Sequence, residues 1–330
     1  MQKLGAAMKV VMINDCAFVG ETLLKYLPAD VEKRHIKRTR SLWSKTFGIA
    51  YSILGAKADI YHVHYLLQDC YIAARMGKKP LVGHAMGSDL RQQLKSRKWG
   101  WIVRSNLKNC NKILVCQPTI LDAAKEYNET AEYLPIPFDP KIFYPKPLHK
   151  DREQKHVLLA SAHDFAIKGT DKLLKAVASM SKMPIKVKTI SFGRDVESAR
   201  QLARELGIKI EFIPKVPHEK MNELYWESDL VLGSFGVGQL DTVAIEAMAC
   251  GRPAVHSIYK EYFSDCPLER LETTEQVSRV ISKLLFDERE IKQRVKGQLE
   301  YVNATHSAFI LAKRLMKIYD TMVSNETSKN

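Results

Sequence analysis

One segment has the residue types that bind a phosphorylated nucleotide: residues 229–255, DLVLGSFGVGQLDTVAIEAMACGRPAV. An apolar strand is predicted to end in a glycine-bearing loop, and a helix is predicted to begin at about Thr242. Backbone amides at a helix start lack internal partners and carry partial positive charge, so they bind phosphate readily. Glu246, one turn into this helix, can accept hydrogen bonds from the vicinal hydroxyls of a ribose. The alternative is a buried βαβ turn with a solvent-facing glutamate.

A second segment, residues 158–177 (LLASAHDFAIKGTDKLLKAV), has the same order of strand, loop and helix. Lys168 and Gly169 stand in the loop, immediately before a predicted helix start at Thr170. A lysine placed there can bring its ammonium group to a phosphate. The alternative is a solvated loop lysine.

Histidines follow or lie within predicted strands of the first half. His84 stands in VGHAMGSDL, followed by Gly87 and Asp89. His62 and His64 lie at i and i+2 on one strand face, a spacing that could begin a metal site. A third ligand is not evident from the sequence, so packing or loop support is the prediction for this pair.

Apolar strands alternate with helices along both halves of the chain. The predicted strands are residues 8–13, 58–64, 80–84, 112–116, 157–161, 185–191, 210–213, 228–233 and 252–256. The better-defined helices are residues 118–127, 170–180, 196–206, 220–226, 242–249, 274–286 and 308–323. This alternation predicts βαβ units with parallel sheets, an α/β fold of two Rossmann-like domains.

Length and composition agree with two soluble domains. A chain of 330 residues exceeds the size at which single cores usually stop growing. Residues 133–149 contain five prolines and predict a boundary. We therefore expect domains at 1–148 and 149–305, and a C-terminal helix at 306–330. Phe309, Ile310, Leu315 and Ile318 have roughly helical spacing in that helix.

The composition also narrows the class of protein. Hydrophobic residues make up 45% and charged residues 27%, which argues against disorder and disulfide scaffolds. No window has the roughly 18 apolar residues of a membrane span, and the first apolar run breaks at Asn14 and Asp15, unlike a signal peptide. Six cysteines without C-x-x-C spacing favour a reducing cytoplasm over a zinc ribbon or redox pair.

Positive charge is concentrated in the first half. Residues 1–150 hold 24 Lys and Arg against 12 Asp and Glu, which gives +12 of the net +14. Two basic segments stand out; one begins at Arg34 and ends at Lys45, and the other begins at Arg91 and ends at Lys112. Both contain tryptophan, which suits an anionic membrane surface. The alternative is a solvated helix face whose tryptophans enter the core. No nucleic-acid-binding motif is present.

Residues 229–255 resemble the signature of family-4 retaining glycosyltransferases, whose fold is called GT-B, and EAMACGRPAV matches it almost residue for residue. The resemblance implies that Glu246 holds the ribose of a sugar nucleotide. The first glutamate of the family's Glu-x7-Glu pair falls on Gly238, so the carboxylate that usually contacts the transferred sugar is missing. Asp241 is either its substitute or a helix N-cap only.

Residues 158–177 are similar to the family segment in which an arginine and, five residues later, a lysine hold the donor diphosphate. Lys168 matches the lysine, and His163 stands at the arginine position. A neutral histidine binds phosphate less strongly than a guanidinium does, although protonation would bring it closer to that role. The resemblance implies donor-binding residues His163, Lys168, Gly169, Pro214, Lys215, Val216, Gly238, Gln239, Leu240, Asp241, Thr242 and Glu246.

The first half resembles the family as well. VGHAMGSDL is similar to a strand that ends in His-x-x-Gly-x-Asp, which implies that His84 faces the transferred sugar. Gly87 and Asp89 would then shape the loop. Gly20 matches the family's N-terminal glycine loop, near the acceptor and the diphosphate. The resemblance also implies that the final helix packs back on the first domain.

Taken together, the resemblance implies a retaining transfer of sugar from a nucleoside-diphosphate sugar to a hydroxyl of a lipid-linked acceptor or growing glycan. It implies catalytic roles for His84, Lys168 and Glu246, no metal ligand and no cofactor besides the donor. The expected place is the cytoplasm, at the inner face of a membrane through the basic segments. Two alternatives stay open: a GT-B sugar-nucleotide epimerase, and a degenerate nucleotide-binding protein.

Overall fold

The computed structural model describes residues 7–38, 47–149 and 152–328. The chain divides into two compact units: unit 1 is Met1–Pro137 with Ala308–Asn330, and unit 2 is Phe138–Ser307. The first division precedes the expected boundary after residue 148. It does so because Phe138 and Phe143 are buried and belong to unit 2, where the Phe138 amide donates to the His306 carbonyl at 2.9 Å.

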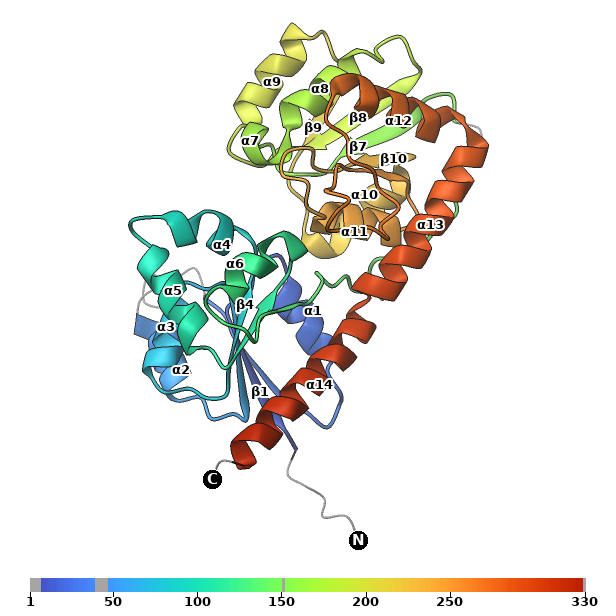
Figure 1. The fold of residues 1–330 in the computed structure, drawn as a ribbon. Coiled ribbons are helices and arrows are strands. Elements are labelled where there is room, and N and C mark those ends of the chain that lie inside the picture. The colour runs from blue at the N-terminus through green and yellow to red at the C-terminus, as the bar shows by residue number, and fades with distance from the viewer. Residues whose placement is uncertain (1–6, 39–46, 150–151, 329–330) are drawn as a thin grey trace. The chain divides into compact units, whose positions relative to one another are not determined.

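Unit 1 is built on a six-stranded parallel sheet with the order β2-β1-β3-β4-β5-β6 (Figure 1). Its strands are β1 Lys9–Ile13, β2 Glu32–Ile36, β3 Ile60–His64, β4 Leu81–Ala85, β5 Lys112–Val115 and β6 Glu132–Tyr133. Its helices are α1 Val19–Tyr26, α2 Ile49–Leu54, α3 Gln68–Arg75, α4 Ser88–Arg91, η2 Gln93–Lys95, α5 Gly100–Asn109, η3 Pro118–Ile120, α6 Leu121–Lys125 and α14 Ala308–Thr327.

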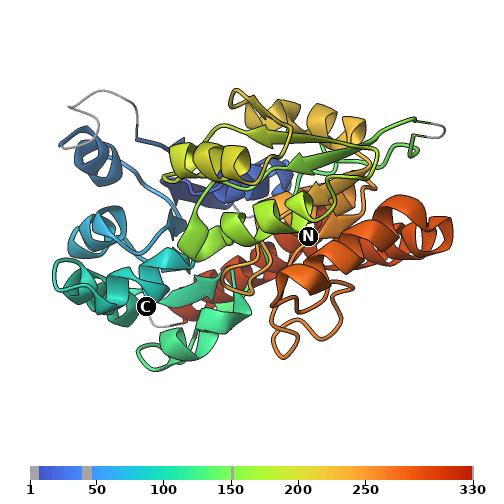
Figure 2. The same ribbon diagram turned by 90° about the horizontal axis from the view of Figure 1, so that it is seen from above.

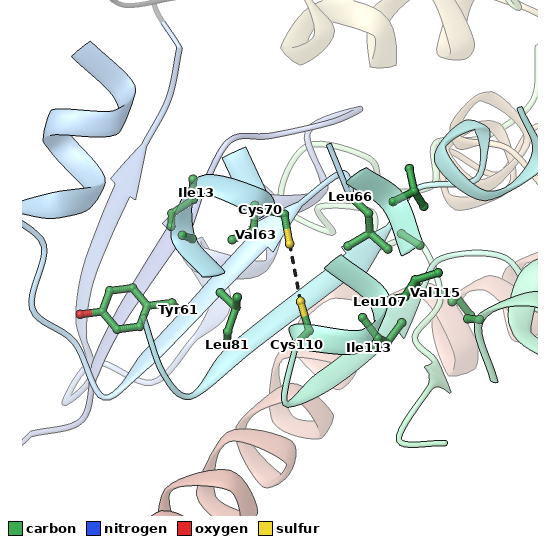
Figure 3. Close-up of a cluster of buried hydrophobic side chains, with 14 of the residues drawn as sticks. Ile13, Tyr61, Val63, Leu66, Cys70, Leu81, Leu107, Cys110, Ile113 and Val115 are labelled. Atoms are coloured by element: carbon green, nitrogen blue, oxygen red, sulfur yellow. Dashed lines mark hydrogen bonds between the residues drawn. The ribbon is translucent and has the colours of Figure 1, made fainter. Parts of the chain in front are cut away.

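The core of unit 1 lies between this sheet and its covering helices. Strands β3 and β4 are buried along their whole length, as expected for parallel strands covered on both faces. Figure 3 shows apolar side chains of the strands packed with those of α3 and α5. Cys70 and Cys110 meet there, with their Sγ atoms 3.5 Å apart. Gly83 leaves them room, because a Cβ at that position would lie 2.9 Å from the Cys110 sulfur.

The last helix, α14, packs against α1 and so belongs to unit 1. The expected packing of Phe309 and Ile310 is wrong, because their side chains are 53% and 43% exposed. Leu311, Leu315 and Tyr319 are buried instead, at the i, i+4, i+8 spacing of one helix face.

Unit 2 is built on a five-stranded parallel sheet with the order β11-β10-β7-β8-β9. Its strands are β7 Lys155–Leu159, β8 Ile185–Ile190, β9 Ile210–Ile213, β10 Leu230–Leu232 and β11 Ala254–Val255. Its helices are α7 Phe165–Lys168, α8 Thr170–Ala178, α9 Val196–Glu205, η4 His218–Lys220, α10 Met221–Glu227, α11 Thr242–Ala249, α12 Thr274–Phe286 and α13 Glu288–His306 (Figure 2).

The strand order fixes where a ligand of unit 2 would bind. The chain runs from β7 outward through β8 to β9, then returns to place β10 on the other side of β7. The loops after β7 and β10 therefore leave the sheet side by side, in opposite directions. In open α/β sheets, ligands bind outside the carboxyl ends of the strands at such a switch point.

Candidate functional site

The loop after β7 carries Lys168 at this switch point. Asp164 caps α7 by accepting the Ile167 amide at 2.8 Å, and the single turn of α7 ends at Lys168. Gly169 follows with φ +63°, a conformation that favours glycine. The helix α8 then begins at Thr170.

The loop after β10 lies directly against this turn. The Phe235 amide donates to the Lys168 carbonyl at 2.8 Å. A Cβ at Gly236 would lie 2.1 Å from the Ile167 carbonyl oxygen, so only glycine permits this approach. The two loops thereby hold Lys168 beside the start of α11.

Lys168 pairs with Asp241 at the start of α11. The distance from Lys168 Nζ to Asp241 Oδ2 is 2.7 Å, and the two side chains are 26% and 19% exposed. Asp241 is the N-cap of α11 and accepts the Ala244 amide at 3.2 Å, while the Ser161 hydroxyl donates to its Oδ2 at 3.4 Å. Burial is the largest influence on Asp241 and opposes its ionisation, but the Lys168 charge, the nearby His256 and the hydrogen bonds from Lys168 and Ala244 together lower the pKa of Asp241 to about 2.

A buried histidine that the sequence analysis did not select holds the loop after β10. His256 Nε2 donates to the Gln239 carbonyl at 2.6 Å, and its Nδ1 accepts the Ser234 amide at 2.8 Å. Burial lowers the pKa of His256. The ring is therefore neutral, although its Nδ1 lies 3.7 Å from Asp241. The only indication of this role in the sequence was that His256 ends the predicted strand 252–256.

Glu246 is buried, which excludes the solvent-facing alternative. Its Oε1 lies 2.5 Å from His218 Nε2, and its Oε2 accepts the Tyr225 hydroxyl at 3.1 Å. Burial raises the pKa of Glu246, although these hydrogen bonds oppose the shift. The His218 ring also packs on Phe143, with centroids 5.3 Å apart. Spacing alone did not reveal the roles of His218 and Tyr225.

The loop before His218 contains the residues expected near the nucleobase. Pro214, Lys215 and Val216 follow β9, and the first two are exposed. Lys215 Nζ lies 5.6 Å from the centre of the Phe192 ring. The exposed loop thus leads into His218, whose side chain contacts the Glu246 carboxylate.

His163 does not stand where a diphosphate ligand would need it. Its side chain is 1% exposed, its Nε2 lies 3.1 Å from the Thr189 hydroxyl, and its ring packs on Phe212. Its backbone pairs with Gly193, where a Cβ would come within 2.4 Å of His163 main-chain atoms. This crossing turns the imidazole toward β8, so the expectation that it faces a phosphate is corrected.

The Tyr259 ring fills the space that a glutamate side chain would need at position 238. Its φ is +59°, and a Cβ there would lie 2.5 Å from Cδ1 of Tyr259. The Tyr259 amide donates to the Gly238 carbonyl at 2.8 Å. Gln239 and Leu240, which follow, are buried, and Thr242 is the first residue of α11.

In unit 1, Asp89 organises the loop after β4. Its buried carboxylate accepts the amides of Leu66, Met86, Gly87 and Leu90 at 2.8–3.2 Å. Gly87 has φ +115° and is the N-cap of α4. Burial raises the pKa of Asp89, and these amides oppose the shift.

His84 and Gly20 are both buried, and each lies against a histidine of β3. His84 is fully buried, and its Nδ1 lies 3.2 Å from His62 Nε2. The Gly20 amide donates to Asp15 at 3.0 Å, and a Cβ at Gly20 would lie 2.8 Å from His64 Nε2. The His84 imidazole is thus enclosed by its neighbours in unit 1, and its place facing a transferred sugar stays a prediction.

Of the two basic segments, only the one that begins at Arg91 is described over its whole length. The segment that begins at Arg34 runs into residues 39–46, which lie outside the described residues. In the other, α5 turns Ile102, Val103 and Leu107 to the core and leaves Trp101 51% exposed beside Arg104 and Lys108. The alternative that Trp101 enters the core is therefore wrong. Among the described helices, none is long and apolar enough to cross a membrane.

Comparison of the whole fold identifies its class. Sucrose-phosphate synthase from Thermosynechococcus elongatus is 15% identical, with a TM-score of 0.73 over 96% of this chain and all of that chain. HepE from Anabaena, in complex with UDP and glucose, is 13% identical, with a TM-score of 0.73 over 95% of this chain and all of that chain. A protein described as UDP-N-acetylglucosamine 2-epimerase, from Listeria monocytogenes, is 14% identical, with a TM-score of 0.66 over 94% and 95%. These likenesses confirm the predicted α/β, GT-B fold.

The family model matches a shorter part of the chain than the structural comparisons do. Residues 145–265 match the family model described as glycosyl transferases group 1. This segment contains Lys168, Asp241 and Glu246, and the match confirms a resemblance to the group 1 glycosyl transferases; family 4, retention and the roles of these residues stay predictions. No curated protein sequence matches the chain.

Proposed function

We propose that the chain transfers a sugar from a nucleoside-diphosphate sugar to a hydroxyl, with retention of the anomeric configuration. The observation that carries the proposal is the convergence of Lys168 Nζ and the first turn of α11 on one carboxylate, that of Asp241. A cation and free helix-start amides are what a diphosphate requires. They lie at the switch point of the sheet, inside the matched segment.

The donor diphosphate would replace Asp241 as the partner of Lys168. Charge then builds on the leaving diphosphate as the sugar departs, and donors already in place stabilise it without reorganisation. Each such donor contributes about 3 kcal/mol in comparable sites. Glu246, held by His218 and Tyr225, would accept the ribose hydroxyls. In this scheme the departing phosphate, rather than a metal, assists the attack.

Turnover of a broad panel of sugar nucleotides with hydroxyl acceptors tests the proposal. We expect Lys168→Ala to lose about 10²–10³ in kcat. Glu246→Gln should raise KM for the donor, since it removes the charge from the ribose acceptor. Lys175→Ala is the matched control, because Lys175 is an exposed lysine two turns along α8. A wild type that binds nucleoside diphosphates yet turns over no donor would refute the enzyme and leave a nucleotide-binding protein.

The epimerase is the second candidate, because one of the similar folds is described as a UDP-N-acetylglucosamine 2-epimerase. The two reactions differ in their need for an acceptor. A product isomeric with the donor, formed when no acceptor is added, would favour the epimerase.

We also propose that unit 1 brings the enzyme to a lipid-linked acceptor at the inner, anionic face of a membrane. Helices α2, α3 and α5 pack together, and Tyr51 and Trp101 are 72% and 51% exposed on them. Exposed Arg104 and Lys108 supply positive charge beside Trp101. Aromatic and basic side chains together suit the interface of an anionic bilayer.

Liposome co-sedimentation tests this contact. Binding should increase with anionic lipid, decrease with salt and fall in Trp101→Ala. Phe309→Ala is the control, because Phe309 is equally exposed on α14 of the same unit. Binding that responds to neither lipid charge nor salt would contradict the proposal.

A further inference from the structure

Three histidines that the sequence placed apart meet inside unit 1. His62 and His64 share one face of β3, and the register of β3 with β4 sets His84 opposite His64. Their nearest ligand nitrogens all lie within 4.8 Å of one another, and all three side chains are fully buried. A third ligand is not evident from the sequence, because only the pairing of β3 with β4 brings His84 beside His62 and His64.

The cluster holds buried nitrogens without partners. Both ring nitrogens of His64 and Nε2 of His84 have no hydrogen-bond partner among the described residues. A buried polar atom left unpaired costs about 1–3 kcal/mol, so such atoms rarely gather without a ligand. Three within one cluster point to a ligand, to which each neutral ring can offer one nitrogen lone pair.

The burial of the three rings favours the uncharged form that a metal requires, because removal from water disfavours the imidazolium. An uncharged imidazole has one nitrogen lone pair to offer a metal ion.

The surroundings orient the rings. The Tyr319 hydroxyl lies 2.6 Å from His62 Nδ1, which leaves His62 Nε2 directed toward His84 Nδ1 at 3.2 Å. A hydrogen bond to the far nitrogen of a ligating histidine is the usual support of a metal site. Gly20 leaves space at His64 Nε2, where a Cβ would lie 2.8 Å away.

We propose that His62, His64 and His84 bind a divalent transition metal ion of the Zn²⁺ class. Imidazole nitrogens suit this class, and metal–nitrogen bonds of about 2.1 Å would draw the three atoms to about 3.4 Å from one another. The ion would tie β3 to β4 and, through Tyr319, to α14. All residues of the proposed site belong to unit 1, whereas the residues of the proposed donor site belong to unit 2.

Metal analysis of a chain without a polyhistidine tag tests the site. Zn²⁺ is added and removed by gel filtration, and bound metal is measured by mass spectrometry. Wild type should keep about one equivalent, since a three-histidine set is a complete protein ligand shell for zinc. His64→Leu should lose it. His149→Gln and His156→Gln, which change histidines outside the cluster, should keep it.

Tyr319→Phe provides a milder variant that keeps all three imidazoles. It should weaken Zn²⁺ affinity about 10–100-fold, as loss of an orienting hydrogen bond does at other sites. Circular dichroism shows whether each variant is folded. Co²⁺ offers a second readout, because nitrogen coordination gives it visible absorption bands. Wild type that binds no more Zn²⁺ than folded His64→Leu, or Tyr319→Phe with unchanged affinity, would overturn the proposal.

Discussion

Lys168 and Asp241 form an ion pair that the donor diphosphate would break under the proposed function. The 2.7 Å contact occupies the lysine that we propose as the diphosphate ligand, and the Asp241 carboxylate would repel incoming phosphates. The aspartate is also the N-cap of α11, where asparagine serves equally well. Asp241 thus has two roles: it caps α11, and its charge competes with a phosphate for Lys168.

Asp241→Asn separates these two roles. Because the cap is kept and the competing charge is lost, we expect a nucleoside diphosphate to bind more tightly by about 1 kcal/mol, or roughly fivefold. Isothermal titration calorimetry gives the Kd. Weaker binding would instead mean that the Asp241 carboxylate itself contacts the donor.

Gly238→Glu would restore the family's missing carboxylate at a place the structure has closed. The new Cβ would meet the Tyr259 ring at 2.5 Å, at a φ of +59°. We expect the free energy of unfolding to fall by about 2–3 kcal/mol, from overpacking added to backbone strain. Gly207→Glu is the control, because its φ is +65° with nothing within 4 Å. Equal losses in the two variants, measured by urea unfolding, would show that Tyr259 contributes nothing.

At the scale of elements, the hydrophobic periodicity predicted much of the fold. The helices at 242–249 and 274–286 and the strand at 210–213 are confirmed with the same bounds. Helix α13 was missed because residues 288–306 have little apolar face; only Gln298, Val302 and His306 are buried along it. Helix α5 was not predicted either, because its buried apolar residues, Ile102, Val103 and Leu107, are interleaved with the charged residues of a basic segment.

The parts of the candidate site that depend on strand order could be predicted from the sequence. The parts that depend on the direction of a side chain could not. Lys168 and Asp241 meet because their loops leave adjacent strands. The inward turn of His163 depends on its crossing with Gly193, which no spacing reveals. The contact of His218 with Glu246, which joins η4 to α11, was likewise not predictable from spacing.

The buried face of α14 should carry its contribution to stability. Leu315→Ala removes a fully buried side chain and should lower the free energy of unfolding by about 2–5 kcal/mol. Phe309→Ala, on the exposed face, should change it by less than about 0.5 kcal/mol. Urea unfolding of both variants checks this, and similar values would contradict the helix face described above.

At the scale of the whole molecule, buried histidines should make stability depend on pH. The folded pKa of His64 is about 4, and burial also depresses those of His62 and His84. In metal-free protein the unfolded chain binds more protons over this range, so stability decreases as pH falls from about 6.5 to about 4.

Unfolding midpoints in urea, measured between pH 7.5 and pH 4.5 in the presence of a chelator, check this dependence. His64→Leu should have a shallower pH dependence than wild type, because one depressed histidine is gone. A wild-type stability that does not change over this range would contradict the burial of the cluster.

The central claim is that unit 2 holds a sugar nucleotide at the switch point of its sheet. A crystal structure of the chain soaked with candidate sugar nucleotides tests it most directly. We predict the diphosphate within hydrogen-bond distance of Lys168 Nζ and the amides at the start of α11, with the ribose on Glu246. A diphosphate bound elsewhere, with the Lys168–Asp241 pair intact, would contradict the account.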